Sequence, residues 1–280
     1  MPRVSVLTPI YNTDPAHLRA CIESVLNQTF TDFEFLIVND SPKNTELDAV
    51  VASYKDARIR YTKNKKNIGI SATRNKLLDM ARGEYVAIFD HDDISVPDRL
   101  ERQVAVLDAN PHIGVVSGWL QHFGASDYLW KTPESDLDIK IAMMYNCCIA
   151  HTATMIRKSV LDENNIRYEE YFSPAEDYRL WARLMGITHF YNIQDVMVRY
   201  RMHNRMTTVR QNDIMNNKWH EIAAELQNTY PAYYDLMKKS DNVHATRFRL
   251  RLFGFIPLIK IKNNWILLFE FIPLCKVRWS

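Results

Sequence analysis

Apolar and polar positions along residues 1–117 follow two alternating periods. Short apolar runs rich in β-branched and aromatic residues, typical of buried strands, alternate with segments whose apolar positions recur every three or four residues, as in helices. The expected strands are 4–7, 33–38, 59–61, 84–89 and 113–117, and the expected helices are 15–28, 47–54, 71–81 and 97–109. This alternation predicts an α/β fold, a mostly parallel sheet flanked by helices.

Polar residues stand where three of these strands end. Thr8 follows the first strand, Asn39 and Asp40 follow the second, and the acid cluster Asp90-His91-Asp92-Asp93 follows the fourth. In open sheets of this kind, ligands bind at the carboxyl ends of the strands. Carboxylates suit hard divalent cations such as Mg²⁺ or Mn²⁺, which often share their coordination with a substrate phosphate. The alternative is an acidic turn that caps the next helix.

Composition narrows the choice of ligand and compartment. The chain is 47% hydrophobic and 24% charged, as in globular proteins, and its net charge of +2 gives no reason to expect nucleic acid. With 7 glycines it has neither a G-x-G-x-x-G fingerprint nor a P-loop, so a diphosphate is expected to be held through a metal ion. The 4 cysteines have neither metal-ligand nor disulfide spacing, which suits a reducing cytoplasm. We find no signal segment and no uninterrupted apolar run of about 18 residues, so no transmembrane helix is expected.

An ordered series of motifs resembles glycosyltransferase family 2, whose members are inverting, metal-dependent enzymes with the GT-A fold. The matching segments, within roughly residues 3 to 205, are Val4–Asn12, Cys21–Thr29, Phe35–Ser41, Asn67–Asn75, Phe89–Asp93 and Ala175–Tyr178. The order of these motifs is more specific than any one of them. The resemblance implies a GT-A fold, to which the residues after about 210 would add a C-terminal helical and amphipathic extension.

The resemblance also implies roles for individual residues. It places in the nucleotide site Thr8, Pro9, Tyr11, Asn39, Asp40, Asn67, Arg74, Asp92, Arg201 and His203. Within this set, Asp40 would accept a hydrogen bond from a uracil N–H, and Arg74 would approach the base or the diphosphate. Asp93 would be the principal ligand of Mn²⁺ or Mg²⁺, with Asp92 beside it. The chain departs from the family at Asn39, where an acid is common, and at 76–77, where glycine is favoured, so we expect an altered nucleotide preference.

A candidate catalytic base lies further along the chain. Ser173 and Glu176 match a capping box, and Pro174 occupies the favoured first helical position, so Glu176 is expected to cap the helix. Asp177 follows in the first turn, where the positive end of the helix favours an ionised carboxylate. By the resemblance, Asp177 would take the proton from the acceptor hydroxyl, and attack would invert the anomeric centre to give a β-linkage. Without the resemblance, Asp177 would read as a solvated acid at the start of a helix.

The sequence changes character after about residue 210, which gives the expected division into units. A transferase domain of residues 1–210 would comprise a nucleotide-binding half (1–118) and an acceptor half (119–210), and residues 211–280 would form a tail. The tail begins with an expected helix, 214–226. It then repeats an apolar, proline-broken segment that ends in bases, 252–262 and 268–278. The basic region 247–278 suits contact with an anionic inner-leaflet membrane surface, or packing on the protein's own core.

The expected activity is transfer of a hexose (glucose, galactose or an N-acetylhexosamine) from a UDP-sugar donor to a hydroxyl of a glycan or lipid-linked glycan, in bacterial surface polysaccharide synthesis. Three rival functions remain at this point. A basic membrane-surface adaptor would explain the tail but would leave the three polar strand ends without a function. A nucleotidyltransferase would normally need a loop rich in glycine and basic residues after the first strand, which residues 12–15 do not provide. A non-catalytic sugar-nucleotide or glycan-binding protein would be expected to lack Asp93 or Asp177.

Overall fold

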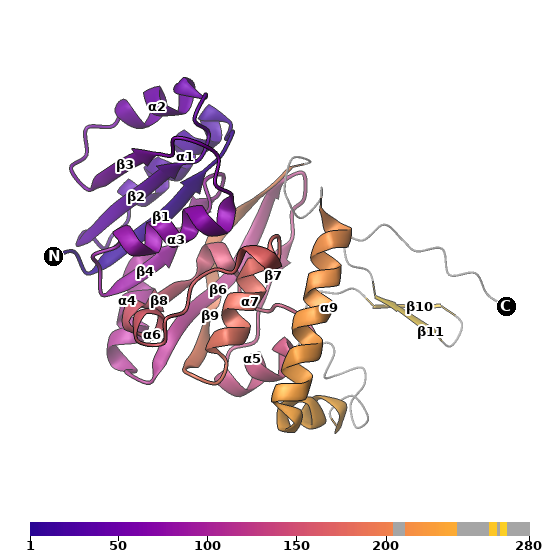
Figure 1. Ribbon diagram of the computed structural model, residues 1–280. Helices are drawn as coiled ribbons and strands as arrows, with labels where there is room; N and C mark the ends of the chain where they lie inside the picture. The colour runs from indigo at the N-terminus through magenta and orange to yellow at the C-terminus, as the bar shows by residue number, and fades with distance from the viewer. Residues whose placement is uncertain (204–210, 240–257, 262–263, 268–280) are drawn as a thin grey trace.

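A mixed, mostly parallel sheet forms the centre of the protein, as Figure 1 shows. The computed structural model describes residues 1–203, 211–239, 258–261 and 264–267. The strands of the main sheet are β1 (Val4–Ile10), β2 (Phe33–Asn39), β3 (Ile59–Lys63), β4 (Tyr85–Ile88), β5 (Ile94–Ser95), β6 (Ile113–Gly124), β7 (Leu129–Trp130), β8 (Met155–Arg157) and β9 (His189–Met202). The helices are α1 (Pro15–Leu26), α2 (Thr45–Ala52), α3 (Ile70–Met80), α4 (Arg99–Ala109), α5 (Asp136–Met143), α6 (Lys158–Glu163), α7 (Glu176–Leu184) and α9 (Asn212–Thr229).

The order of strands in the sheet is β3-β2-β1-β4-β8-β6-β9-β5, with β7 paired to β6. The first four strands are parallel to one another. The short β8 is antiparallel to both of its neighbours, β4 and β6, whereas β6 and β9 are parallel. Because β1, β2 and β4 are parallel neighbours, their carboxyl ends meet at one edge of the sheet. The expectation that these strand ends converge is confirmed.

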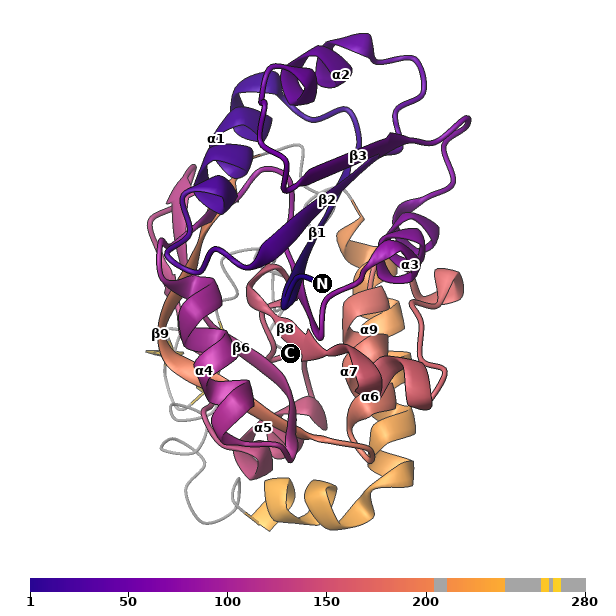
Figure 2. The ribbon, with the colours of Figure 1, turned by 90° about the vertical axis from the view of Figure 1, so that its left-hand side faces the viewer.

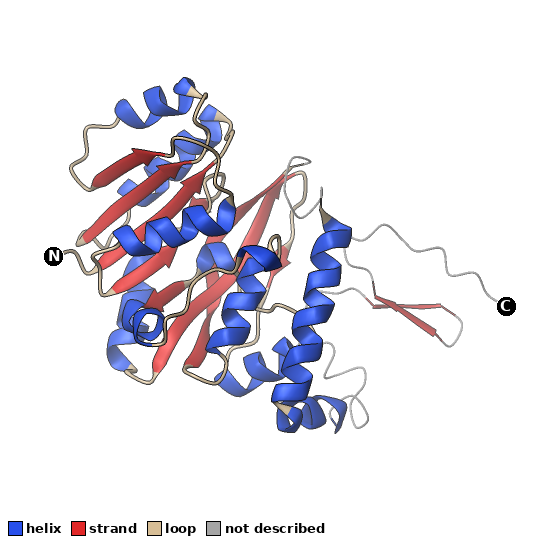
Figure 3. Cartoon of the chain, in the orientation of Figure 1, coloured by secondary structure: helices blue, strands red, loops and turns tan. Residues whose placement is uncertain are grey.

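The sheet separates two hydrophobic cores. Side chains alternate between the faces of a strand, and in β2 Phe35 and Ile37 join one core while Leu36 and Val38 join the other. The helices α1, α2 and α4 cover the first face, and α3, α5, α6, α7 and α9 cover the second. Figure 2 shows α1 and α4 on one side of the sheet and α3, α6, α7 and α9 on the other, and Figure 3 shows the same layers by element type. Burial on both faces explains why the central strands are apolar almost throughout.

Helix starts follow the capping chemistry of the local sequence where it is available. Asp14 caps α1 by accepting a hydrogen bond from the Ala16 N–H, with Pro15 in the first turn. Asn44 caps α2 in the same way, accepting from the N–H groups of Glu46 and Leu47. Both helices end within two residues of their expected positions. Such caps set where the loops from strand to helix end, and those loops lie at the edge of the sheet that carries the site.

Some elements differ from the sequence-based expectation. The first strand runs on to Ile10, so Thr8 lies within β1 rather than after it. The strand that begins at Ile113 continues to Gly124, because the long β9 pairs with it over its whole length. The short strands β5 and β8 were not expected, since two or three residues give no measurable periodicity.

The helix expected at 214–226 forms as α9 and packs on α7. Its residues Met215, Ile222 and Leu226 belong to the core on the second face of the sheet. Helix α9 therefore shares the core of the preceding residues, and the expected boundary at residue 210 does not divide that core. Most of the basic region 247–278 lies outside the described residues, apart from the antiparallel pair β10 (Leu258–Ile261) and β11 (Asn264–Leu267). Across the described ranges, no helix combines the length and the apolarity needed to span a membrane.

Candidate active site

The acid cluster lies directly after β4, at the carboxyl edge of the sheet, and β9 lies against it. Asp93 is fully buried; its carboxylate accepts hydrogen bonds from the Thr152 hydroxyl (2.8 Å) and from the Arg201 backbone N–H (2.8 Å). The Arg201 side chain donates to the Asp92 carbonyl at 2.8 Å, and His203 Nε2 lies 2.9 Å from the Asp92 carboxylate. The tertiary structure thus brings Arg201 and His203, at the end of β9, next to Asp92 and Asp93.

Two carboxyl groups of this cluster have pKa values shifted in opposite directions. Burial, together with the charges of Asp92 and Asp90, raises the pKa of Asp93 well above its ordinary value. Burial also opposes ionisation of Asp92, but the neighbouring His91 and His203 outweigh it and lower the pKa of Asp92. The cluster therefore holds more carboxylates than the surrounding positive charge can keep ionised. Added positive charge at this point would be bound favourably.

A buried arginine lies behind the acid cluster. Arg99, at the start of α4, is 1% exposed and donates to the carbonyl oxygens of Ile88 (2.8 Å) and Thr154 (3.3 Å). Burial lowers the pKa of Arg99 to about 9, although Asp93 and Asp90 oppose this shift. By joining the end of β4 to the segment that carries Thr152, Arg99 fixes the backbone that carries the cluster. No sequence pattern distinguishes Arg99, because an arginine in the first turn of a helix is usually exposed.

Asp40 organises a loop rather than pointing freely into the site. Its carboxylate accepts hydrogen bonds from the Ile68 and Gly69 N–H groups, at 2.9 and 3.0 Å, and from the Asn64 amide at 2.8 Å. Gly69 has φ of 84°, a conformation that favours glycine, so the loop depends on this residue type. Asn67, in the same loop, is exposed. Contact of Asp40 with a nucleotide base stays a prediction.

Thr8 and Asn39 lie deeper than the sequence analysis expected. Both are fully buried, and Thr8 donates its hydroxyl hydrogen to the Phe89 carbonyl at 2.9 Å. The Asn39 side chain donates to Asp48 and Tyr61 and accepts from the Ser41 N–H. Their polar atoms are thus already bonded inside the protein, which differs from the expected direct contact with a base. Pro9 is likewise buried.

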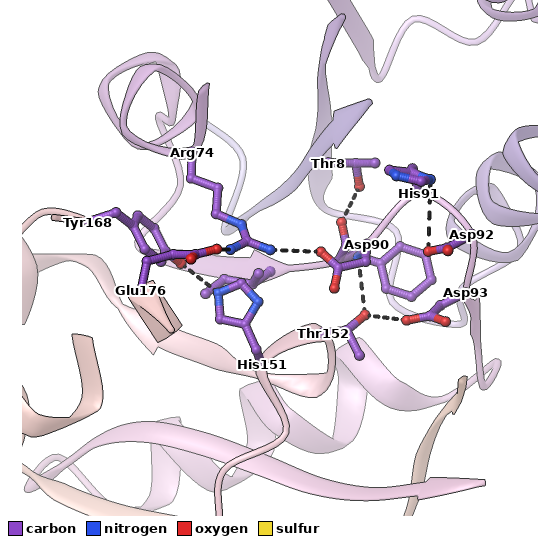
Figure 4. Close-up of polar contacts among 12 residues, drawn as sticks. Thr8, Arg74, Asp90, His91, Asp92, Asp93, His151, Thr152, Tyr168 and Glu176 are labelled. Atoms are coloured by element: carbon purple, nitrogen blue, oxygen red, sulfur yellow. Dashed lines mark hydrogen bonds and ion pairs between the residues drawn. The ribbon is translucent and has the colours of Figure 1, made fainter. Parts of the chain in front are cut away.

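The partners of Arg74 differ from those expected. Its guanidinium donates to Glu176 at 2.6 Å and to Asp90 at 3.2 Å, and it lies over the Tyr168 ring (Figure 4). The capping-box prediction for Glu176 is therefore wrong, because its carboxylate is bound to Arg74. Ala175, not Ser173, is the N-cap of α7, and no side chain caps it. The ion pair between Arg74 and Glu176 joins residues 102 positions apart in the sequence, so no local pattern could have revealed it.

Asp177 lies in the first turn of α7, half-buried, and its carboxylate accepts a hydrogen bond from the Tyr178 N–H at 2.7 Å. Burial raises the pKa of Asp177 to about 7, and the neighbouring Glu176 adds to the shift. The position in the helix was expected, but the expectation of a readily ionised carboxylate is corrected, since burial outweighs the helix N-terminus. A carboxylate with a pKa near neutral is well matched to proton abstraction near pH 7.

The donor set at the acid cluster fits a hard divalent cation. Within the described ranges, no group of three or more His, Cys, Asp or Glu side chains forms a complete metal site. Mg²⁺ and similar ions, however, are commonly held by one or two carboxylates together with substrate phosphates. Asp93 and Asp92 supply those carboxylates, and the raised pKa of Asp93 indicates that positive charge is in deficit there. A cation held jointly with a phosphate fits these residues.

Comparison of the sequence with known proteins identifies a matching family. Residues 5–164 match the model of the family described as Glycosyl transferase family 2. An uncharacterized glycosyltransferase of Methanocaldococcus jannaschii is 33% identical over 217 residues, which cover 73% of this chain and 72% of the relative. The amylovoran biosynthesis glycosyltransferase AmsE of Erwinia amylovora is 29% identical over 230 residues, covering 80% of this chain and 83% of AmsE.

Solved structures share the fold at low sequence identity. TarS of S. aureus, in complex with UDP-GlcNAc, has a TM-score of 0.66 at 18% identity, over 89% of this chain and 76% of that one. The mannosyltransferase PcManGT of Pyrobaculum calidifontis, in complex with GDP-Man and Mn²⁺, has a TM-score of 0.59 at 15% identity, over 89% and 82%. The mostly parallel α/β fold expected from the sequence is confirmed.

Proposed function

Because the chain belongs to glycosyl transferase family 2, and is thus a glycosyltransferase, we propose that it moves a hexose from a UDP-sugar to a hydroxyl of a glycan or lipid-linked glycan in surface polysaccharide synthesis. The observation that carries this proposal is the arrangement around Arg74. One guanidinium contacts both Asp90, in the acid cluster, and Glu176, which directly precedes Asp177 (Figure 4). A candidate metal site and a candidate base thereby lie on opposite sides of one residue.

The donor diphosphate would bind at the acid cluster. Asp93 and Asp92 would hold Mn²⁺ or Mg²⁺, whose Lewis acidity offsets the charge that develops on the leaving diphosphate. Support comes from the charge imbalance of the cluster and from Mn²⁺ bound with GDP-Man in PcManGT. Arg201 and His203, which contact Asp92, would orient the phosphates.

The nucleoside would lie on the loop that Asp40 organises. Asn67 and Tyr11 are exposed at this end of the sheet and would contact the base, while Asp40 holds the backbone of the loop. Thr8, Pro9 and Asn39 are buried and would act indirectly, by fixing the strand ends that support the pocket. TarS binds UDP-GlcNAc and PcManGT binds GDP-Man, so the choice of uracil for this chain is our proposal.

Asp177 would be the catalytic residue that accepts the proton of the acceptor hydroxyl. The hydroxyl oxygen would then form a bond to the anomeric carbon as the bond to the diphosphate breaks on the opposite face. Such in-line attack inverts the anomeric centre, so an α-linked donor gives a β-linked product. The pKa of Asp177, about 7, lets a substantial fraction of the carboxyl act as a base at neutral pH.

A relative and the composition of the tail support the proposed acceptor class. AmsE is named for amylovoran biosynthesis, which supports a polysaccharide acceptor. The basic and apolar region 247–278 would bring the enzyme to an anionic membrane surface where a lipid-linked glycan is held. Binding to that surface is part of the proposal.

Thermal unfolding with nucleotides tests the donor site first. UDP, GDP, dTDP and CMP are each added with and without Mn²⁺, and a ligand at about a hundred times its Kd should stabilise the protein by about 2.7 kcal/mol. We expect a higher melting temperature with UDP only when Mn²⁺ is present, and we expect Asp93→Ala to lose this effect. A larger shift with another nucleotide would refute the choice of UDP.

Transfer of the sugar is then measured with radiolabelled UDP-hexoses and lipid-linked glycan acceptors. Formation of a labelled β-linked product supports the proposal. Tight binding of a UDP-sugar without any turnover would favour a sugar-nucleotide-binding protein instead.

A further inference from the structure

A closed ring of contacts joins the acid cluster to the start of α7. Arg74 donates to Asp90 at 3.2 Å, and the Asp90 N–H donates to the Thr152 hydroxyl at 3.1 Å. Next to Thr152 in the chain, His151 Nε2 lies 2.9 Å from the Tyr168 hydroxyl. Tyr168 then pairs through its backbone with the side chain of Asn75, the neighbour of Arg74, by two hydrogen bonds of 2.8 and 2.9 Å. We call these residues, Arg74, Asn75, Asp90, His151, Thr152 and Tyr168, the polar ring.

The polar ring is largely buried, with Asn75 and Asp90 partly exposed, and takes its residues from separate parts of the fold. His151, Thr152 and Tyr168 are 8%, 2% and 5% exposed, and the Arg74 side chain is 11% exposed. Arg74 comes from α3, and Asp90 follows β4. His151 and Thr152 lie in a short 3₁₀ helix (His151–Ala153) before β8, and Tyr168 lies before α7. Figure 4 shows the Arg74 guanidinium between Glu176 and Asp90, with Tyr168 and His151 beside it. Because buried hydrogen-bond networks hold their members rigidly, the ring fixes these segments against one another.

Glu176 attaches the base-bearing helix to this ring. Its side chain is 8% exposed and is bound to Arg74 at 2.6 Å, and Asp177 is the next residue of α7. A guanidinium is a planar fork that can hold two carboxylates in a fixed relation, whereas an ammonium is a single point of charge. Since its two terminal nitrogens donate to Glu176 and Asp90, Arg74 is better suited to hold α7 at the acid cluster than to bind the nucleotide.

We propose that Arg74 and Glu176, supported by the polar ring, are positioning residues that set the place of Asp177 relative to the acid cluster. This inference rests on the proposed glycosyltransferase function and reassigns Arg74 from nucleotide contact to alignment of the two halves of the site. In a reaction between two bound substrates, a base displaced by about 1 Å can cost about a hundredfold in rate while donor affinity is unaffected.

The test separates turnover from nucleotide binding. Glu176→Gln and Arg74→Lys each keep a side chain of similar size, but the first removes one charge of the pair and the second removes the fork. We expect kcat to fall about tenfold to a hundredfold in both, with KM for the donor and the calorimetric Kd for UDP and Mn²⁺ within about twofold of the wild type. The double variant should lose little more than either single variant, because both act through one contact.

A matched control keeps a general loss of stability apart from lost positioning. Glu34 is also a buried carboxylate paired with an arginine, Arg60, but it joins β2 to β3 away from the site. Glu34→Gln should lower the melting temperature yet leave kcat within about twofold. Tyr168→Phe removes only the bond to His151 and should lower kcat severalfold with unchanged Kd, which keeps the inference testable if Glu176→Gln fails to fold.

The outcomes are distinct. Weaker UDP binding with unchanged kcat in Arg74→Lys would overturn the positioning role in favour of nucleotide contact. Additive losses in the double variant, or a kcat for Glu176→Gln equal to that of Glu34→Gln, would also overturn it. A wild-type chain that transfers no sugar from any donor would instead overturn the proposed function, and the positioning role with it.

Discussion

Asp177 shows at the residue scale how burial changes what one carboxylate does. Its place at the start of α7 favours the ionised form, whereas desolvation and the adjacent Glu176 favour the protonated form, and the result is a pKa of about 7. Arg74 lowers this pKa and Asp90 raises it, so the same residues that fix α7 also set the charge of the base. Position and proton affinity are therefore coupled at this residue.

The activity of the enzyme should follow the ionisation of Asp177. Because the base acts only when deprotonated, we expect kcat to rise between about pH 6 and about pH 8, with its midpoint near 7. Asp177→Asn keeps an oxygen for the Tyr178 N–H but cannot take a proton, so it should bind UDP normally and show no transfer at any pH. Steady-state rates and calorimetry across this pH range check both statements, and transfer by Asp177→Asn would remove the residue from the mechanism.

The wild-type protein and the Asp177→Asn variant should differ in stability over a defined pH range. Since the folded pKa of Asp177 lies above its ordinary value of 3.8, the folded state holds a proton that the unfolded state loses between about pH 4 and 7. Ionisation of Asp177 therefore lowers the free energy of unfolding of the wild type as the pH rises through that range. Asp177→Asn removes the cost, and its melting temperature at pH 8 should equal or exceed that of the wild type.

At the scale of elements, the helix α9 stabilises the face of the sheet that carries α7. Leu226 is 3% exposed and lies in the same core as Tyr178 and Trp181 of α7. Residues on both sides of the expected boundary at 210 therefore contribute to one core. A shared core predicts that these elements unfold together.

Truncation of one buried side chain in α9 tests this cooperation. Leu226→Ala should lower the free energy of unfolding by about 2 to 4 kcal/mol, because it removes apolar contacts and leaves a cavity. Leu236→Ala, at a position that is 43% exposed, is the control and should change it by about 0.5 kcal/mol or less. Chemical denaturation should show a single transition in each case. A second transition affected only by Leu226→Ala would indicate that residues from 211 onward form a separate unit.

For the whole molecule, one sheet edge carries both halves of the proposed reaction. The parallel strands β1, β2 and β4 bring the loop that Asp40 organises and the acid cluster together, and β9 adds Arg201 and His203 from the opposite end of the sheet. Helix α7 brings Asp177 from the second face. In the proposed function, the basic tail would place this edge near a lipid-linked acceptor.

The proposed membrane contact can be tested on the full chain. We expect the full chain to sediment with vesicles that contain phosphatidylglycerol but not with vesicles of phosphatidylcholine alone. Each Lys or Arg side chain near an anionic surface contributes about 1 kcal/mol to binding. The attraction should weaken as salt is added. A variant in which Lys260, Lys262, Lys276 and Arg278 are replaced by glutamine should bind less. Equal binding by this variant would assign the tail to packing on the protein itself.

Apart from the two-residue strand β5, the sequence by itself determined the order of strands and helices through Ala109, because apolar periodicity is local and these elements are long enough to display it. It also determined that the acid cluster follows a buried strand and that Asp177 opens a helix, because each statement concerns neighbours in the chain. The motif order was sufficient to indicate the family.

Only the tertiary structure decided which residues face one another. It assigned Glu176 to Arg74, placed Arg201 and His203 at the acid cluster, and closed Thr8 and Asn39 into the interior. It also raised the pKa of Asp177 to about 7. Each of these outcomes depends on segments tens to about a hundred residues apart, which pack together and exclude water. A local sequence pattern predicts neither the contacts nor the desolvation that arise at such separations.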